Sequence, residues 1–437
     1  MINNNSFNSR SFVKRAAILE KDYTFPKFIV FLFFVFSIYL VVPIVDVPFL
    51  GLSISAPIFF FISIYCILKT PKSWLMVYRY WIIMAILIWA GIFLSATLNG
   101  LFSGGLNINS EGIKTVIRYA YWLLVFIITM YVSSYRNILI KVTELLGWGV
   151  LFLALLRWIE IYLFQNIGAW SGTKFLPQNA YGMLFSTFSP FLLVNTIRFK
   201  GLKRSLSILG FLILISAMII NGSRSSWVAV GLGILLFLSL LYSTHKRKVI
   251  SILFMLILTS GIIMTIFSFI PVISESFITR AFTFETLEND KSFVMRQLMN
   301  QKSIRIFENS PIIGVGSSRF RLTNVELIVP GLLGYLDQSY INRISSHNSY
   351  LGFLAETGLI GSFPLLILLC VLLINGYKHV NEFLNNKQIW ALGIYVSYIQ
   401  MSIHMWSFSS FTSSSTWFIY GLLGALIMKS KLKQFKE

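Results

Sequence analysis

The chain has 437 residues, of which 56% are hydrophobic and only 12% are charged, and its mean hydropathy is +0.75. A soluble globular protein carries about a quarter charged residues, so this composition excludes that class and predicts an all-α polytopic membrane protein. The net charge of +20 would suggest a nucleic-acid partner for a soluble protein. In a membrane protein the basic residues of the loops instead set the topology, so we expect membrane lipids and no nucleic acid as partners.

A helix needs about 20 mostly apolar residues to cross a bilayer, and the sequence predicts about twelve such spans. Nine precede a long polar loop and three follow it. We therefore divide the chain into residues 1–271 with an amino-terminal tail and nine spans, residues 272–348 with the loop, and residues 349–437 with three spans and a tail. The predicted spans are 28–45, 52–68, 78–97, 117–133, 139–160, 179–197, 205–221, 226–243, 249–270, 349–375, 389–407 and 414–429.

The basic residues of the loops indicate which side of the membrane each loop occupies. Most Lys and Arg residues fall in the two tails and in every second loop. The opposite short loops hold only Lys114, Arg118, Lys174 and Arg224. Because short loops rich in Lys and Arg stay in the cytoplasm, we predict that both termini are cytoplasmic and that the long loop faces outward.

A very short turn between the seventh and eighth predicted spans carries the first candidate residue. The turn reads Asn221-Gly222-Ser223-Arg224-Ser225-Ser226-Trp227 and places Arg224 at the outer membrane boundary. One interpretation is an interfacial arginine that reaches lipid headgroups beside a tryptophan. The other is an anion clamp, in which Arg224, Ser225, Ser226 and the N–H groups that open the next helix bind phosphate oxygens. An arginine on the sparsely charged side, in so short a turn, favours the clamp.

The long loop contains a predicted amphipathic helix at 289–309, where apolar residues recur at helical spacing. Asp290 or Ser292 would cap its start, and Pro311 lies just beyond its end. Its basic residues are, in order, Arg296, Lys302 and Arg305. A basic helix of this kind can lie on the membrane surface, which is the role we expect for the last two of them.

Two further motifs complete the loop. Gly314 and Gly316 suit a tight turn and a close approach of two backbones. His347 and Asn348 stand where the loop turns into the tenth predicted span, and Glu356 follows within that span. A histidine has an ordinary pKa of about 6.5, so His347 can accept a proton from a hydroxyl at neutral pH. Its alternative role is to cap the helix, and Glu356 is expected to be a buried structural carboxyl that forms hydrogen bonds.

In this order, and on the outer side, these motifs resemble the O-antigen ligase family and its sibling polysaccharide polymerases. The residues that carry the resemblance are Ser223-Arg224-Ser225-Ser226-Trp227, Arg296, Ser310-Pro311-Ile312-Ile313-Gly314-Val315-Gly316, His347-Asn348-Ser349-Tyr350-Leu351 and Glu356-Thr357-Gly358-Leu359-Ile360-Gly361. The similarity in motif covers residues 220–361, and the number of spans and the position of the loop extend it to the whole chain.

The resemblance implies a GT-C-like glycosyltransferase of the bacterial inner membrane. It would take a glycan from a polyprenyl diphosphate at the periplasmic face and transfer it to a saccharide hydroxyl, as in ligation of O-antigen to lipid A–core. Residues matching Arg224 and Arg296 would hold the diphosphate, and His347 would activate the acceptor hydroxyl. The supporting positions are Ser225, Asn348, Glu356, Gly314 and Gly316. One departure is Asn300, where relatives often carry an aromatic residue; it leaves Arg305 as a rival to Arg296.

The chemistry of these side chains agrees with this interpretation. Displacing a sugar from a diphosphate requires charge stabilisation on the leaving group and a base for the attacking hydroxyl, which two arginines and a histidine supply. The sequence has no Asp-x-Asp motif or dense outer carboxylate cluster, so we expect neither a metal ion nor another cofactor. Direct displacement would invert the anomeric centre. His404, inside the eleventh predicted span, is a second candidate histidine.

Three alternatives remain open or less favoured. A sibling polymerase would use the same donor and base but a lipid-linked repeat as its acceptor, and the sequence does not separate it from a ligase. A polytopic transporter would often show two related halves, and no internal repeat is apparent. A structural scaffold would not require the arginines and the histidine on the outer side. Sugar identity, linkage and oligomeric state are also undetermined by the sequence.

Overall fold

The computed structural model describes residues 25–43, 55–69, 72–102, 110–164, 176–268, 290–331, 334, 337–409 and 411–434. All regular secondary structure in these ranges is helical, which confirms the predicted all-α class. The tails at 1–24 and 435–437 lie outside the described residues, as does 272–289, the first part of the predicted loop.

Apolar runs of the predicted lengths become the helices of a bundle, and the described part of the polar loop contributes two more. The bundle helices are α2 (Lys27–Val41), α3 (Ser55–Lys69), α4 (Lys72–Val77), α5 (Arg79–Phe102), α6 (Ser110–Ser133), α7 (Arg136–Phe164), α8 (Gln178–Arg198), α9 (Gly201–Asn221), α10 (Arg224–Ser268), α14 (Ser349–Asn385), α15 (Trp390–His404) and α16 (Ser414–Gln434). The loop helices are α12 (Lys291–Asn309) and α13 (Gln338–Asn342). Each predicted span overlaps a bundle helix. The eighth and ninth both fall in α10, which non-helical backbone angles at His245 divide into two parts.

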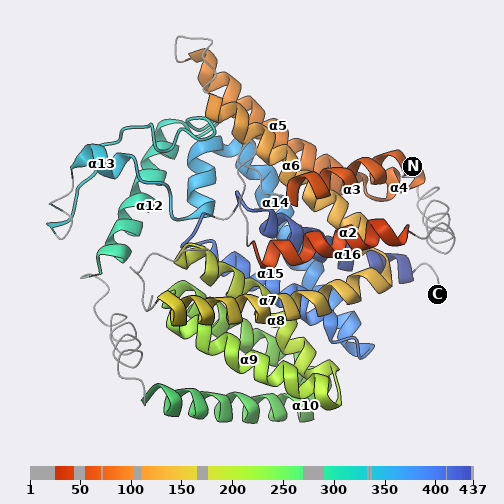
Figure 1. Ribbon diagram of the computed structural model, residues 1–437. Helices are drawn as coiled ribbons and strands as arrows, with labels where there is room; N and C mark the ends of the chain where they lie inside the picture. Colours follow the sequence, from red (N-terminus) through yellow and green to blue (C-terminus); the bar gives the residue numbers. More distant parts are fainter. Residues whose placement is uncertain are drawn as a thin grey trace, which may run out of the picture.

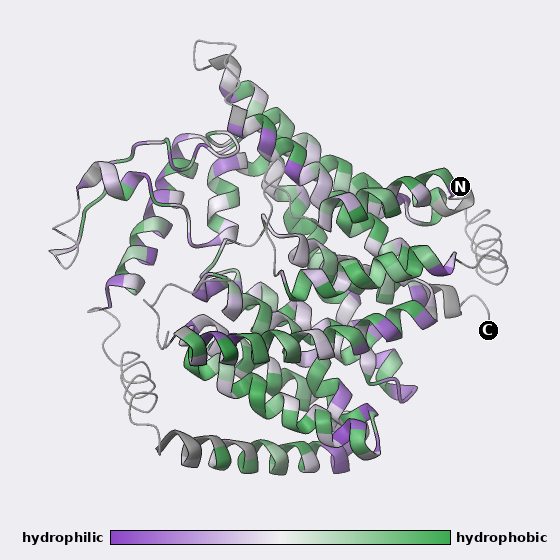
Figure 2. Ribbon diagram, viewed as in Figure 1, coloured by the Kyte–Doolittle hydropathy of each residue, from purple (hydrophilic) through white to green (hydrophobic). Residues whose placement is uncertain are grey.

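Seven of the described helices are long and apolar enough to cross a membrane: α5, α6, α7, α8, α9, α10 and α14. The apolar helices α2 and α3 are shorter. The protein is therefore a multi-pass membrane protein, while a total of twelve crossings stays a prediction. Figure 2 shows that the bundle is mostly hydrophobic and that hydrophilic residues gather on α12 and the chain around it.

The bundle packs through small residues at close helix crossings, as in membrane proteins generally. α5 lies against α14 where Gly91 meets Gly361, and a Cβ atom at Gly91 would stand 2.7 Å from the Gly361 Cα. α6 lies against α16, where a Cβ atom at Gly421 would stand 2.7 Å from the Phe126 carbonyl oxygen. Figure 1 places α12 and α13 at one end of the bundle and the end of α16 at the other.

The helix α12 packs into a small core of the loop rather than onto a membrane surface. Its buried residues Leu298 and Ile306 join a cluster with Phe320, Ile341 and other apolar residues. The cluster also includes Ala355 of α14, so α12 is fixed to the bundle. Its hydrophobic face is therefore covered by protein.

This packing corrects the role predicted for Lys302. Lys302 is fully buried, its ammonium group donates a hydrogen bond to the Asn342 carbonyl at 2.5 Å, and its Nζ lies 4.7 Å from the centre of the Phe320 ring. Burial lowers the pKa of Lys302 to about 8. The expectation of a membrane-facing lysine is wrong, because the long side chain joins α12 to the rest of the loop. Arg305 is exposed and donates to the Glu326 carbonyl.

A break in α14 receives the glycine-containing segment of the loop. Gly358 has a φ of +58°. Around it the backbone of α14 forms hydrogen bonds with the glycine-containing segment of the loop. The N–H groups of Val315 and Gly316 donate to the carbonyls of Ala355 and Glu356 at 3.1 and 2.9 Å. Gly314 has a φ of +66°, and a Cβ atom there would stand 2.5 Å from the Glu356 carbonyl oxygen. The predicted close approach at these glycines is confirmed, and it fixes the loop to α14.

Candidate functional site: the junction of α10, α12, α14 and α15

The turn before α10 presents Arg224 beside the start of α12. Helix α9 ends at Asn221, and Gly222 adopts a left-handed conformation with a φ of +69°, which allows α10 to begin two residues later. The turn is anchored to α8: the Asn221 side chain donates to the Gln178 carbonyl at 3.0 Å, and the Gln178 side chain donates to the Asn221 carbonyl at 2.5 Å. The backbone that carries Arg224 is therefore well fixed.

Arg224 forms an ion pair with Asp290. The two side chains are only 11% and 15% exposed, and the Arg224 Nη2 lies 2.5 Å from the Asp290 Oδ2. The other Asp290 oxygen accepts from the Phe293 N–H at 2.9 Å and caps α12, as predicted. Burial alone would raise the pKa of Asp290, but the hydrogen bonds from Phe293 and Arg224 outweigh it and hold that pKa below its ordinary value. Arg224 is thus held by a protein side chain. The interpretation in which Arg224 only reaches lipid headgroups does not account for this ion pair.

Ser225 joins the turn to the end of α15. Its Oγ lies 3.2 Å from the His404 Nε2, and His404 is the buried last residue of that helix. Ser223 extends the network, with its Oγ 3.3 Å from the Ser225 Oγ. His404, the second candidate histidine, therefore faces the bundle interior beside the Arg224 turn.

Arg296 and Arg305 lie on opposite faces of α12. They are nine residues apart, which at about 100° per residue is half a turn out of phase. Arg296 is half-buried, and its positive charge acts on both His347 and His404. Arg305 is exposed and is bound to the carbonyl of Glu326. This geometry favours Arg296 over Arg305 as the second arginine of the predicted diphosphate site, beside Arg224.

His347 is half-buried and directly precedes α14. Burial lowers its pKa, and the nearby charges of Arg296 and Arg321 lower it further. The cap of α14 is the next residue: the Asn348 Oδ1 accepts from the N–H groups of Tyr350 and Leu351 at 3.0 and 3.1 Å. The alternative role of His347 as the cap is therefore wrong, because Asn348 performs it. His347 is kept neutral at neutral pH and faces a cationic neighbourhood.

The segment that carries His347 is docked on the chain that follows α15. The Ser349 N–H donates to the Met405 carbonyl at 2.9 Å, and its Oγ donates to the Phe408 carbonyl at 2.5 Å. Ser409 donates to the Ser346 carbonyl. These bonds set the distance between the start of α14 and the end of α15. The two histidines are thus held in one neighbourhood.

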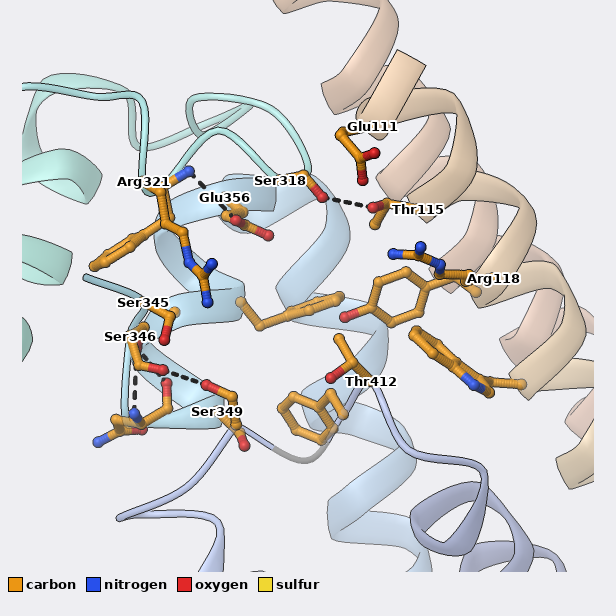
Figure 3. A pocket seen from close by; sticks show the side chains of 18 of the residues that line it. Glu111, Thr115, Arg118, Ser318, Arg321, Ser345, Ser346, Ser349, Glu356 and Thr412 are labelled. Carbon is orange, nitrogen blue, oxygen red and sulfur yellow. Dashed lines mark hydrogen bonds between the residues drawn. The ribbon is translucent and has the colours of Figure 1, made fainter. Parts of the chain in front are cut away.

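A cavity of about 720 Å³ adjoins the same segment, which contributes Ser346, Asn348 and Ser349 to its lining. Figure 3 shows how polar side chains from α6, from the loop and from α14 converge on it. Its lining residues are Glu111, Thr115, Arg118, Tyr119, Trp122, Ser318, Phe320, Arg321, Leu322, Ser345, Ser346, Asn348, Ser349, Gly352, Phe353, Glu356, Ser409, Phe411 and Thr412. Asn348 and Glu356 are the only predicted site residues among them. The sequence signal for this cavity was Arg118, one of the few basic residues on the predicted outer side.

Glu356 forms structural hydrogen bonds in the cavity wall. Its Oε1 accepts from the Phe320 N–H at 3.3 Å. Its backbone carbonyl accepts from the Ser95 hydroxyl at 2.8 Å. It therefore joins the loop to α14 and α5, which agrees with the structural carboxyl expected from the sequence.

Residues 209–374 match the family model described as O-Antigen ligase. This match supports an O-antigen ligase-like family. It confirms the resemblance seen in the sequence and covers every predicted site residue from Arg224 to Glu356, while His404 lies outside it. The search of curated proteins found no match. Together with the apolar helices, the family match supports a multi-pass membrane enzyme of O-antigen or polysaccharide assembly.

Proposed function

We propose that this O-antigen ligase-like protein transfers a glycan from a polyprenyl diphosphate donor to a saccharide hydroxyl. The observation that carries the proposal is the placement of Arg224 at the start of α10, Arg296 in the second turn of α12 and His347 just before α14. The Arg224–Asp290 pair joins α10 to α12, and the charge of Arg296 acts on His347. His404 connects the group, because it contacts the residue after Arg224 and lies within the field of Arg296. The two arginines can stabilise the negative charge of a diphosphate leaving group. The neutral imidazole of His347 can accept the proton of the attacking hydroxyl.

The reaction is a direct displacement at the anomeric carbon. The acceptor oxygen forms a bond to the anomeric carbon. At the same time the bond between the anomeric carbon and the diphosphate oxygen breaks, and the diphosphate leaves with the electron pair. Arg224 and Arg296 stabilise the charge that develops on the leaving group. The hydroxyl proton passes to the neutral imidazole of His347. Attack opposite the leaving group inverts the anomeric centre, and the guanidinium groups allow charge stabilisation without a metal ion.

In this proposal the Asp290 carboxylate binds Arg224 before the donor diphosphate does. Its carboxylate occupies one edge of the guanidinium at 2.5 Å. A diphosphate offers several anionic oxygens and binds arginine in a bidentate manner. Donor binding therefore exchanges part of the Asp290 contact for phosphate contacts.

The proposal includes the location, which combines the charge pattern of the loops with the resemblance to the O-antigen ligase family. With basic loops inside, the amino and carboxyl termini are cytoplasmic, the protein crosses the bacterial inner membrane twelve times, and loop 272–348 faces the periplasm. The site at the starts of α10, α12 and α14 then opens to the periplasmic face. The GT-C-like arrangement belongs to the same proposal.

The acceptor decides between a ligase and a polymerase. A ligase transfers the glycan to lipid A–core, which we favour, whereas a polymerase transfers it to a lipid-linked repeat of O-antigen or another surface polysaccharide. The test is the surface polysaccharide of a deletion strain. Loss of long chains with accumulation of lipid-linked polymer supports the ligase, and a single repeat left on the core supports the polymerase. Unchanged surface polysaccharide would contradict both.

A further inference from the structure

The cavity between α6, α14 and residues 318–322 has the lining of a carbohydrate site. Aromatic rings from three parts of the chain meet in edge-to-face contacts: Tyr119 and Trp122 at 4.9 Å, Tyr119 and Phe353 at 5.8 Å, and Phe353 and Phe411 at 5.6 Å between ring centres. Such pairs are held rigidly, and flat aromatic faces pack well against the C–H faces of sugar rings. The serines of the cavity wall add hydrogen-bonding groups.

Two arginines bring positive charge to this cavity. Arg118 comes from α6 and Arg321 from the loop, and Figure 3 shows both side chains at the cavity. The Nε of Arg118 is buried and has no hydrogen-bond partner among the described residues. A buried donor of this kind is costly unless a partner is present. A bound anionic group would supply one.

The two carboxylates of the lining offset part of this charge, since Glu111 interacts electrostatically with Arg118 and Glu356 with Arg321. Glu111 forms an ion pair with Lys114 at 2.6 Å. Glu356 accepts backbone hydrogen bonds from the loop. With Lys114 beside Glu111, three cations stand against two carboxylates here, so the region of the cavity keeps a net positive charge beside its aromatic surface.

The cavity is also connected to the proposed base. Ser346 and Asn348, on either side of His347, both line it. The charge of Arg321, a lining residue, acts on His347. The arginines assigned to the diphosphate, Arg224 and Arg296, do not line it. A saccharide in this cavity would thus lie next to the segment that carries the base and apart from the residues assigned to the leaving group.

We infer that this cavity binds the acceptor saccharide and that Arg118 and Arg321 recognise an anionic substituent, a phosphate or a carboxylate, on it. The inference rests on the proposed glycan transfer, because it assigns the acceptor side of that reaction. A volume of about 720 Å³ is of the size that holds a small oligosaccharide rather than a single sugar. The lipid part of either substrate stays in the membrane.

The test measures saccharide binding to the purified full-length protein in the absence of transfer. The probes are a core oligosaccharide released from lipid A, and the same oligosaccharide after removal of its phosphates and reduction of its carboxyls. A polyprenyl diphosphate-linked glycan is the donor probe. The variants are Arg118→Gln, Arg321→Gln and Thr412→Trp, which fills the rim of the cavity without a change in charge. Arg305→Gln is the matched control, because Arg305 is a loop arginine remote from the cavity.

Wild-type protein should bind the native oligosaccharide at least tenfold more tightly than its neutral derivative. Both glutamine variants should reduce this preference at least tenfold, and Thr412→Trp should weaken both saccharides. Donor binding should stay within twofold in all variants, and Arg305→Gln should match wild type. If the variants weaken the donor and not the oligosaccharide, the cavity holds the donor glycan and the inference is wrong. It is also wrong if no variant changes saccharide binding. A protein that binds as described but transfers no glycan contradicts the proposed function alone.

Discussion

Arg224 and Asp290 are 66 positions apart in the chain, yet their side chains meet at 2.5 Å and join the start of α10 to the cap of α12. The contact fixes the arginine of one motif against the helix that carries the other, Arg296. It also places a carboxylate where the donor diphosphate is proposed to bind. Because Asp290 also caps α12, binding of the donor at Arg224 should affect how the start of α12 is held.

Replacing Asp290 with asparagine should strengthen donor binding. Asparagine caps helices as well as aspartate does, so α12 should keep its stability, while the competing charge at Arg224 is removed. An ion pair of this kind is worth about 1 kcal/mol, so donor affinity should rise by about fivefold. Binding of a polyprenyl diphosphate to purified protein checks this.

The control for that experiment is Asp290→Ala, which loses both the charge and the cap. It should lower the free energy of unfolding by about 1 kcal/mol relative to the asparagine variant. Weaker donor binding in Asp290→Asn would indicate that the carboxylate orients Arg224 for the donor instead of competing with it.

Removing either arginine of the site should abolish glycan transfer. Arg224→Ala and Arg296→Ala each lose a cation that is proposed to stabilise the leaving group, while protein abundance in the membrane should remain near that of wild type. Lysine should rescue poorly at both positions, because a point charge cannot reproduce the planar fork of a guanidinium on phosphate. Transfer assays on matched amounts of protein give the result.

Arg305→Ala serves as the control for the arginine pair, since Arg305 lies on the opposite face of α12 and contacts the Glu326 carbonyl. It should retain transfer activity close to wild type. Full activity in Arg224→Ala would return that residue to a purely interfacial role, and loss of activity in Arg305→Ala would reopen the choice between Arg296 and Arg305.

The pH dependence of transfer should reflect the protonation of His347. Burial and the charges of Arg296 and Arg321 place its pKa below the ordinary value of 6.5. The neutral imidazole is the active form, so kcat/KM should hold steady around neutral pH and fall only as the pH drops through this lowered pKa. Arg321→Gln removes one of the cations, which should raise the pKa of His347 and move the acid limb to higher pH. An unmoved acid limb in Arg321→Gln, matching Arg305→Gln, would assign the limb to another group.

Reporter fusions test the predicted topology. A reporter inserted near Glu326 should be periplasmic, because Glu326 lies in the long loop, and one placed after Glu437 should be cytoplasmic. Activity of both reporters on the same side would contradict the twelve-span arrangement.

The sequence was sufficient for those features that depend on local pattern. Apolar runs predicted where the bundle helices lie. Asp290, which caps α12, was one of two candidate caps, because capping depends on the residues beside the helix start. The close approach at Gly314 was also predicted, because few residues other than glycine adopt its backbone conformation.

Features that depend on distant packing were missed. Lys302 was expected at the membrane surface, but the loop builds its own core around α12 and buries it. The pairing of Arg224 with Asp290 and of Ser225 with His404 joins residues whose separation in sequence gives no sign of contact. The cavity combines α6 with the loop and α14, so the sequence indicated Asn348, Glu356 and the outer charge of Arg118 separately, with no sign that they line one cavity.

The central claim is that His347 is the general base, and its most direct test compares wild type, His347→Ala and His347→Asn. Donor binding and glycan transfer are measured separately on each purified protein. Because Asn348 caps α14, both variants should fold and bind donor like wild type. Loss of general-base assistance should lower the rate of transfer by about 10²- to 10⁴-fold in both. Transfer at the wild-type rate by His347→Asn would contradict the account, because asparagine cannot accept the proton of the attacking hydroxyl.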